Sequence, residues 1–436
     1  MALATSALLI AGLVLTKSVS ATIPGTNEGV SISTIGGSPN NLANQVSLSQ
    51  NGRFAAFASK ATNLVNETVS GSYDEVYVRD RLNDTTTLAS ISSSGLVANG
   101  DSEDLMLSAD GRYVVFKSNA SNLGSNGSTY HIFLHDMQTG ATQIVDTNSN
   151  GVADGTYGSM EPSVSADGRY VVFSSFSTNL VTTPSLTSHS YSYVYLKDMQ
   201  TGTVELLSIG TGGSAPNGSS GYPRIDCGGD EVAFYSTASD LVANDLNGQE
   251  DVFLYDQIDG TTKDITISSD GSSTINSISC NGEYMGVTSY ATNLTAANIS
   301  GNIESAYEYD RLNDKFTLAS QSSDGILGNA DSNGAFVSND GRVVAFSSMA
   351  TNLTSSDNDS SGWDIFLRNI ETSTTEMIDI NSSGVQANAP AYAPSLSANG
   401  KYVGYSSPAT NLISGYGYTS GQGAAYVSET GVVDNY

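Results

Sequence analysis

The sequence predicts an all-β protein, namely a seven-bladed β-propeller of four-stranded antiparallel blades. Two observations predict this fold. A hairpin signature recurs seven times at a nearly constant interval, and a second signature of the type Ala-Thr-Asn-Leu recurs once in each interval. In addition, no stretch of useful length has the 3.6-residue periodicity of a helix. A fixed period of this length indicates a repeat architecture.

The hairpin signature is clearest in residues 162–173, which read Pro-Ser-Val-Ser-Ala-Asp-Gly-Arg-Tyr-Val-Val-Phe. We interpret it as a strand, a two-residue turn and a second strand, because glycine accepts a positive φ and aspartate bonds the backbone across a turn. The mean interval between the turn glycines is 58 residues. Six copies have Asp-Gly or Asn-Gly turns, and the fourth copy is more divergent, with Gly228-Gly229 at the turn. These turns are Asn51-Gly52, Asp110-Gly111, Asp167-Gly168, Asn281-Gly282, Asp340-Gly341 and Asn399-Gly400.

Two further strands follow within each period. After the second signature, as in residues 61–64, an apolar third strand such as Val76–Asp80 is expected. A short turn then leads to a fourth strand, for example Thr86–Ser90. Four strands in each of seven periods give seven blades.

The chain divides into two expected parts. Residues 1–21 have an apolar run at 7–15 and a small-residue site, Val19-Ser20-Ala21, which is typical of a signal peptide. The apolar run is too short to span a bilayer. Residues 22–436 are then expected to form a single propeller domain with about 59 residues per blade. We expect the mature protein to be secreted or periplasmic, without membrane insertion, and monomeric.

The composition is strongly acidic, with 44 Asp and Glu residues against 16 Lys and Arg and a formal net charge of −28. This charge argues against nucleic-acid binding, because that requires basic patches that displace counterions from phosphates. Two interpretations of the charge stay open. It either keeps the exterior solvated or attracts divalent cations or basic partners.

The two cysteines, Cys227 and Cys280, occupy the same position, two residues before the turn glycine, in the fourth and fifth repeats. Equivalent positions of adjacent blades lie side by side, so an exported protein is expected to join them by a disulfide. The alternative is a pair of buried free thiols.

The ring must also close. Residues 29–33 resemble the fourth strand of a blade without its first three strands, so we expect them to complete the seventh blade. The alternative is that Val432-Val433 completes it. Seven residues just before the innermost strands are expected to line one mouth of the central channel. They are Gln45, Asp104, Glu161, Tyr222, Ile275, Gly334 and Ala393.

Few residues suggest chemistry. Asp104 and Glu161 on adjacent blades are candidate catalytic carboxyls, since an acid–base pair needs two of them in a concave site; otherwise they are solvated mouth residues. No cofactor motif occurs. Two acidic loops precede third strands and are candidate calcium sites, because calcium prefers several oxygen ligands on such loops; the alternative is turn formation. Their candidate ligands are Asp245, Asn247 and Asp251, and Asp357, Asp359 and Asp364.

The repeated Pro-Ser-x-Ser-Ala-Asp-Gly-Arg-Tyr-Val-x-Phe motif resembles the WD-like repeat of TolB-type β-propellers over nearly the whole expected mature chain. The resemblance implies the fold but not the activity, because propellers host many functions. We expect the chain to differ from TolB in having seven repeats rather than six and no preceding α/β domain. We expect a non-catalytic module that binds or scaffolds an unidentified protein or glycan. The alternative is a carbohydrate-active enzyme, a lyase or hydrolase with its site at the channel mouth.

Overall fold

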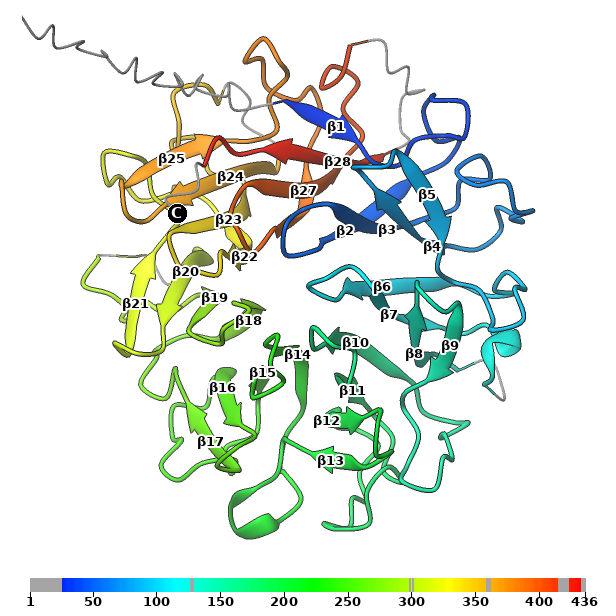
Figure 1. The fold of residues 1–436 in the computed structure, drawn as a ribbon. Coiled ribbons are helices and arrows are strands. Elements are labelled where there is room, and N and C mark those ends of the chain that lie inside the picture. The colour runs from blue at the N-terminus through cyan, green and yellow to red at the C-terminus, as the bar shows by residue number, and fades with distance from the viewer. Residues whose placement is uncertain are drawn as a thin grey trace, which may run out of the picture.

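The computed structural model describes residues 26–432 apart from 126–128, 298, 300–301, 358–361 and 415–422. Seven four-stranded antiparallel sheets are arranged around a central axis (Figure 1), which confirms the predicted seven-bladed propeller. No α-helix occurs in this part of the chain, and only two short 3₁₀ turns are present. They are η1 (Ser121–Leu123) and η2 (Thr211–Gly213). The expected leader, residues 1–21, lies outside the described residues.

Blades 1 to 6 are each built from four consecutive strands, with the first strand next to the axis and the fourth on the outside. Blade 1 consists of β2 (Ala43–Leu48), β3 (Phe54–Ser59), β4 (Glu75–Asp80) and β5 (Thr85–Leu88). Blade 2 consists of β6 (Ser102–Leu107), β7 (Tyr113–Ser118), β8 (His131–Asp136) and β9 (Ala141–Ile144). Blade 3 consists of β10 (Ser159–Val164), β11 (Tyr170–Ser175), β12 (Tyr193–Asp198) and β13 (Val204–Leu206). Blades 4 and 5 consist of β14 (Ser220–Ile225), β15 (Glu231–Ser236), β16 (Asp251–Asp256) and β17 (Thr261–Asp264); and β18 (Ser273–Ile278), β19 (Tyr284–Ser289), β20 (Ser305–Asp310) and β21 (Lys315–Leu318). Blade 6 consists of β22 (Ser332–Val337), β23 (Val343–Ser348), β24 (Asp364–Asn369) and β25 (Thr374–Met377).

Blade 7 is completed by the N-terminal strand. Its three C-terminal strands are β26 (Tyr392–Leu396), β27 (Tyr402–Ser407) and β28 (Ala424–Glu429), and β1 (Asn27–Gly29) pairs antiparallel with β28. Figure 1 shows β1 in blue beside β28 in red. The expected closure by an N-terminal strand is therefore confirmed, although the strand lies two residues earlier than residues 29–33. Val432, of the alternative Val432-Val433, is not part of the sheet, and Val433 lies outside the described residues.

The reason for this shift is a contact that every blade repeats. Two residues after each fourth strand, a Ser, Thr or Asp side chain accepts a hydrogen bond from the second residue of the third strand. Ser31 therefore takes this position in blade 7 instead of extending the strand. The seven acceptors are Ser31, Ser90, Asp146, Ser208, Thr266, Ser320 and Asp379.

The hairpin turns are longer than the sequence suggested. Five residues, not two, separate β10 from β11, and the same spacing separates β2 from β3. Ser165 bonds the carboxylate of Asp167, which also accepts the N–H of Arg169, and Gly168 closes the turn with a positive φ of 72°. All seven turn glycines have positive φ, as predicted. The two-residue interpretation was wrong because the turn has its own set of hydrogen bonds. The N–H of Ser165 donates to the carbonyl of Tyr170 and the N–H of Gly168 to the carbonyl of Ser165, while side chains of the turn accept the N–H groups of Arg169 and Tyr170.

The turn glycines also join neighbouring blades. A Cβ atom added to Gly168 would lie 2.6 Å from the ring of Tyr113, which belongs to the preceding blade. Gly52, Gly111, Gly229 and Gly341 likewise lie against an aromatic ring of the preceding blade. The glycine therefore serves twice, because it adopts the left-handed conformation and lets the next blade approach closely.

The second signature fixes the loops on the opposite face. In blade 7, the N–H of Asn388 donates to Asn411 and the N–H of Thr410 donates to Asn388, so the two loops hold each other reciprocally. Blades 1, 4, 5 and 6 have the same pairing, with Asp in place of Asn at two positions. In blade 2 the N–H of Asn99 donates to Asn122, and the N–H of Asn122 itself donates to Asn99. We call this side the mouth face and the side of the Asp-Gly turns the turn face.

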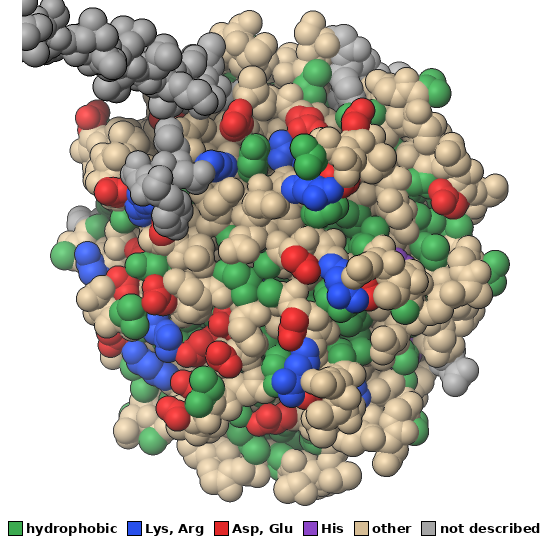
Figure 2. All heavy atoms as spheres, in the orientation of Figure 1, with side chains coloured by type: hydrophobic (Ala, Val, Ile, Leu, Met, Phe, Trp, Pro, Cys, Tyr) green, Lys and Arg blue, Asp and Glu red, His purple; other side chains and the backbone are tan. Residues whose placement is uncertain are grey.

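Apolar clusters fill the space between adjacent blades, as expected for sheets that bury their faces on their neighbours. One cluster joins Ala56 and Val78 of blade 1 to Val114 and Phe116 of blade 2. Among the charged groups, basic and acidic side chains lie next to one another on the face shown in Figure 2 rather than in separate patches. Arg53–Asp80, Arg112–Asp136 and Arg169–Asp198 are examples of such ion pairs.

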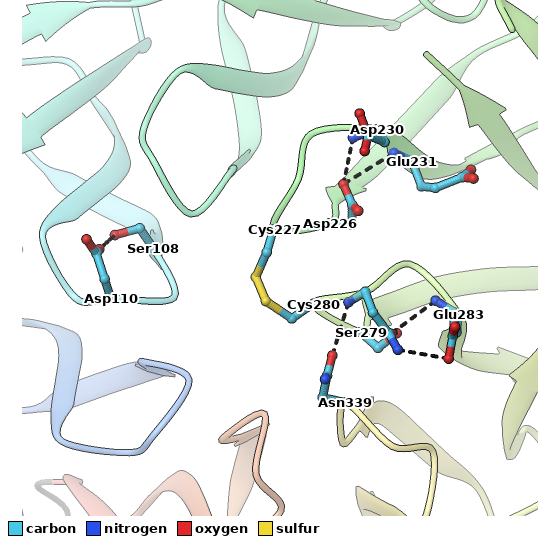
Figure 3. The surroundings of a disulfide bond; sticks show 11 residues. Ser108, Asp110, Asp226, Cys227, Asp230, Glu231, Ser279, Cys280, Glu283 and Asn339 are labelled. Carbon is cyan, nitrogen blue, oxygen red and sulfur yellow. Dashed lines mark hydrogen bonds between the residues drawn. A yellow bond between two sulfur atoms is a disulfide. The ribbon is translucent and has the colours of Figure 1, made fainter. Parts of the chain in front are cut away.

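The junction between blades 4 and 5 departs from this scheme. Gly282 lies against Glu231 instead of an aromatic ring, and Arg311 pairs with Glu231 at 2.6 Å. At this junction a disulfide joins Cys227 to Cys280, whose Cα atoms are 4.6 Å apart. Figure 3 shows the bond linking two neighbouring turns close to the axis. The N–H of Cys227 also donates to the carbonyl of Cys280.

Candidate functional site

The mouth of the axial channel is formed by a bulge in each innermost strand. The pairing register between the first two strands shifts in all seven blades, for example between Met160 and Ser163. Pro162 lies in this bulge rather than at the start of its strand, so its missing N–H falls where the ladder is already interrupted. Six of the seven expected mouth residues have positive φ. They are Gln45, Asp104, Glu161, Tyr222, Gly334 and Ala393.

The two candidate catalytic carboxylates are held by hydrogen bonds between blades. The N–H of Asp104 donates to Gln45 Oε1 at 2.7 Å, and the N–H of Glu161 donates to Asp104 Oδ2 at 2.7 Å. The N–H of Tyr222 in turn donates to Glu161 Oε2 at 2.8 Å, and Ser174 Oγ donates to the same oxygen. Each acceptor thus satisfies the exposed N–H of the next left-handed residue. Asp104 and Glu161, the two candidate catalytic residues, therefore have a structural role, because each accepts a hydrogen bond from the backbone of the next blade.

Ile275 does not belong to the mouth ring. It is fully buried in the apolar cluster between blades 4 and 5 and pairs with Val287, because the bulge of blade 5 leaves one residue of the inner strand unpaired where the bulges of the other blades leave two. Asn276 takes the mouth position, and its Oδ1 accepts the N–H of Ala335 in the next blade. The expectation for Ile275 was therefore wrong by one residue.

The turn face narrows the channel from the other side. Backbone hydrogen bonds join the turns of adjacent blades, for example from Gln50 to Ala109 and from Asn339 to Ala398. The cavity between the innermost strands has a volume of ≈ 140 Å³, and its lining includes Met106, Arg224 and Phe336. Pockets for small organic ligands typically measure roughly 300–1,000 Å³. The channel interior is therefore too small for a substrate of that size.

Large apolar side chains are exposed on the mouth face of four consecutive blades. Tyr222, Tyr290, Met349 and Tyr392 lie where the innermost strand begins or where the second strand ends, and they are 43%, 41%, 38% and 44% exposed. Carboxylates lie at the corresponding strand ends around the ring. They include Asp74, Asp101, Glu103, Glu304 and Asp331. The mouth face thus combines exposed tyrosines with an acidic rim, in which Asp74 and Asp101 pair with Lys60 and Glu103 pairs with Lys117.

The first acidic loop brings together some of its expected residues. Asp245 and Asp251 are buried and lie close to Asp264, which the sequence interpretation missed; a carboxylate oxygen of each lies within 4.8 Å of the others. Asn247 does not face this group with its oxygen. Its Nδ2 donates to Asp251 Oδ1 at 3.0 Å, and its own oxygen accepts the N–H of Gln249.

The second acidic loop has a different arrangement. Gln386 Nε2 donates to Asp364 Oδ1 at 3.1 Å and lies 3.5 Å from Asp357 Oδ1, while Asp359 lies outside the described residues. Burial and the neighbouring Asp364 raise the pKa of Asp379 well above its ordinary value. These carboxyl groups are thus engaged by an amide and by one another.

Comparisons with known proteins identify a fold. No family model and no curated protein matches the chain. The β-propeller domain of the trilobed protease from Pyrococcus furiosus matches with a TM-score of 0.54 and 10% identity, over 91% of this chain and 97% of that one. TolB from Acinetobacter baumannii matches with a TM-score of 0.41 and 14% identity, over 82% and 76% of the two chains. The acylaminoacyl peptidase of Pyrococcus horikoshii gives 0.49 and 12%, over 84% and 49%.

The likeness is one of fold. TolB proteins are among the structural neighbours, as the sequence resemblance implied, and so is the β-propeller domain of a protease. The P. furiosus propeller is described as having an open velcro topology, whereas β1 closes the ring of this chain. Within the residues that the structure describes, no helix is long and apolar enough to cross a membrane.

Proposed function

We propose that this protein is a non-catalytic, exported binding module that holds a partner protein on its mouth face. The observation that carries the proposal is the row of exposed residues Tyr222, Tyr290, Met349 and Tyr392 beside an acidic rim. Tyrosine and methionine are enriched at protein interfaces, whereas monomer surfaces rarely gather several large apolar side chains. The acidic rim and the net charge of −28 favour a partner whose contact surface is basic.

Two features argue against the enzymatic alternative. Asp104 and Glu161 each accept a hydrogen bond from the backbone of the following blade, and the adjoining cavity is smaller than a small-molecule site. An acid–base pair instead needs carboxyls that are available to a substrate in a concave site. Export rests on the leader-like residues 1–21, and N-terminal sequencing of the mature protein should begin near Thr22.

To identify the partner, the full chain is immobilised and exposed to native extracellular proteins, and the proteins that it retains are identified by mass spectrometry. The double variant Tyr222→Ala/Tyr392→Ala should lose a protein that the wild type retains at low salt, and retention should weaken as salt rises. The matched control is Leu82→Ala/Leu312→Ala, which removes exposed leucines in turns on the opposite face. Loss of the partner from both variants, or from neither, would contradict a mouth-face site. Specific binding to a glycan array without a protein partner would replace the proposal by glycan recognition.

A further inference from the structure

Three carboxylates of blade 4 converge in the interior beneath the mouth face. Asp245 lies in the loop between β15 and β16, Asp251 begins β16 and Asp264 ends β17. They are only 6%, 0% and 6% exposed, and one oxygen of each lies within 4.8 Å of the other two. Three separate segments of the blade therefore deliver one acidic oxygen each to the same buried point.

Each carboxylate uses one oxygen within the protein and leaves the other without a partner. Asp251 Oδ1 accepts hydrogen bonds from Thr266 Oγ1, Asn247 Nδ2 and Ser269 Oγ, whereas its Oδ2 is buried and has no partner. Asp264 Oδ1 accepts the N–H of Thr266, and its Oδ2 is likewise without a partner.

Asp245 follows the same pattern. The backbone N–H of Asn247 bonds its carboxylate, and Asp245 Oδ1 remains buried and without a partner. Donors thus orient all three groups, and one buried oxygen of each carboxylate is left without a partner. Ligating carboxylates at metal sites are oriented by hydrogen bonds in this way.

Other blades have apolar side chains at the positions of Asp264 and Asp245, whereas the position of Asp251, the first residue of the third strand, is polar in most blades, for example Glu75 and Asp364. Asp264 pairs with Phe253 in the sheet, and its equivalents in blades 1, 3 and 5 are buried leucines. They are Leu88, Leu206 and Leu318, which pair with Tyr77, Tyr195 and Tyr307. The loops before the third strands of these blades supply the buried residues Val69, Leu186 and Ile299, where blade 4 supplies Asp245. The architecture of the blade therefore does not require acids at the positions of Asp245 and Asp264.

Burying these acids without compensation is unfavourable. Among the described residues, no lysine, arginine or histidine forms an ion pair with Asp245, Asp251 or Asp264. Burial and the two neighbouring carboxylates raise the pKa of Asp264 to about 7. A buried carboxylate is ordinarily paired, neutralised or bound to a metal.

We propose that Asp245 Oδ1, Asp251 Oδ2 and Asp264 Oδ2 bind one hard divalent cation, with Ca²⁺ the ion that fits an all-oxygen site. Two oxygens bound to one Ca²⁺ at roughly 2.3–2.6 Å lie at most about 5 Å apart, which the observed spacing satisfies. The absence of His and Cys from this group disfavours zinc and copper. The cation holds the loop before β16 to the end of β17, and Asn247 is a positioning residue for Asp251.

The test uses full-length protein stripped with EDTA and titrated calorimetrically with CaCl₂, MgCl₂, MnCl₂ and ZnCl₂. One hard cation should bind with a stoichiometry of one. At a concentration a hundredfold above Kd it should raise Tm by about 3 °C for a chain of this length. Asp264→Leu, which installs the residue of blades 1, 3 and 5, should abolish both effects and melt above the wild type in EDTA. Asp264→Asn serves the same purpose if the leucine variant does not fold.

The matched control is Asp259→Asn, which removes the same charge from an exposed position of blade 4 and should bind the cation as the wild type does. Binding of Mg²⁺ or Mn²⁺ in place of Ca²⁺ supports the site and identifies its cation. Two results overturn the proposal: no binding of any of these hard cations, or binding and a Tm rise that persist in Asp264→Leu.

Discussion

Removing the disulfide between blades 4 and 5 should weaken the ring at its least regular junction. The change is Cys227→Ser together with Cys280→Ser, which replaces the S–S bond while keeping side chains of similar size. Gly282 lacks the aromatic contact that joins most other blades, and Glu231 paired with Arg311 stands in its place. The disulfide therefore supplies the covalent link where this repeated contact is missing.

The magnitude follows from the sequence separation of 53 residues between the two cysteines. On the chain-entropy model, closing a loop of this length restricts the unfolded chain enough to stabilise the native state by about 4 kcal/mol. The entropy of unfolding of a chain of about 400 residues is roughly 0.8 kcal/mol/K, so the expected loss in Tm is about 5 °C.

The assay is thermal unfolding followed by circular dichroism, with and without reductant. The wild type should lose about 5 °C on reduction, and the double serine variant should melt at the lower temperature in both buffers. The variant is thus its own control for other effects of the reductant. A wild type whose two thiols are labelled without reductant, or a variant that melts within 1 °C of the oxidised wild type, would refute the reasoning.

Three further predictions concern single residues. Gly168→Ala should cost at least about 2 kcal/mol of unfolding free energy, because a Cβ would strike the neighbouring ring as well as strain the positive φ; Gly140→Ala, with positive φ but open space, should cost about 1 kcal/mol in denaturant titration. Burial raises the pKa of Glu75 to about 8, so the folded state binds its proton more tightly and stability falls as pH rises from about 4.5 to 8. Glu75→Gln should remove this loss and exceed the wild type by up to about 4 kcal/mol at pH 9, with little difference at pH 4.5; equal pH profiles would contradict the assignment. Glu161→Ala should cost about 1–3 kcal/mol by leaving the N–H of Tyr222 without an acceptor, whereas Glu161→Gln, which keeps an acceptor, should cost less than 1 kcal/mol; equal losses would contradict the structural role.

The ring could be predicted from the sequence because its determinants are local and repeated. Gly168 and its equivalents need positive φ whatever surrounds them, so their spacing reveals the blades. The two cysteines were informative for the same reason, since equal positions in adjacent repeats become neighbours in space. The N-terminal strand was recognised by the same comparison, although the Ser31 contact that sets its end was not.

The remaining features depend on contacts that no local pattern records. Asp264 stands 13 residues after Asp251, at the end of a fourth strand that reads as ordinary, and only the pairing of β17 with β16 brings it to the acidic loop. A signal was nonetheless present, because the aligned repeats have leucine or another apolar residue at most positions equivalent to Asp264. The prediction that Ile275 lines the mouth was wrong for a different reason. The bulge of blade 5 leaves one residue fewer unpaired than the other bulges, so Ile275 lies in the core.

Equivalent positions of the seven blades separate the residues that determine the fold from those that have another role. Residues shared by the seven blades, such as the turn glycines and the acceptors after the fourth strands, account for the fold. Residues at which one blade departs from its six equivalents at an energetic cost are those that need another explanation. Blade 4 has the clearest departure, with Asp245 and Asp264 in positions that are apolar and buried in blades 1, 3 and 5.

The claim that the carboxylates of blade 4 bind a cation is tested most directly by a crystal structure of the full chain, from crystals grown in the presence of Ca²⁺. We predict a single strong density peak about 2.4 Å from Asp245 Oδ1, Asp251 Oδ2 and Asp264 Oδ2, with water or carbonyl oxygens completing six to eight ligands. A blade 4 in which these oxygens turn away from one another, or enclose only a water molecule at hydrogen-bond distance, would contradict it.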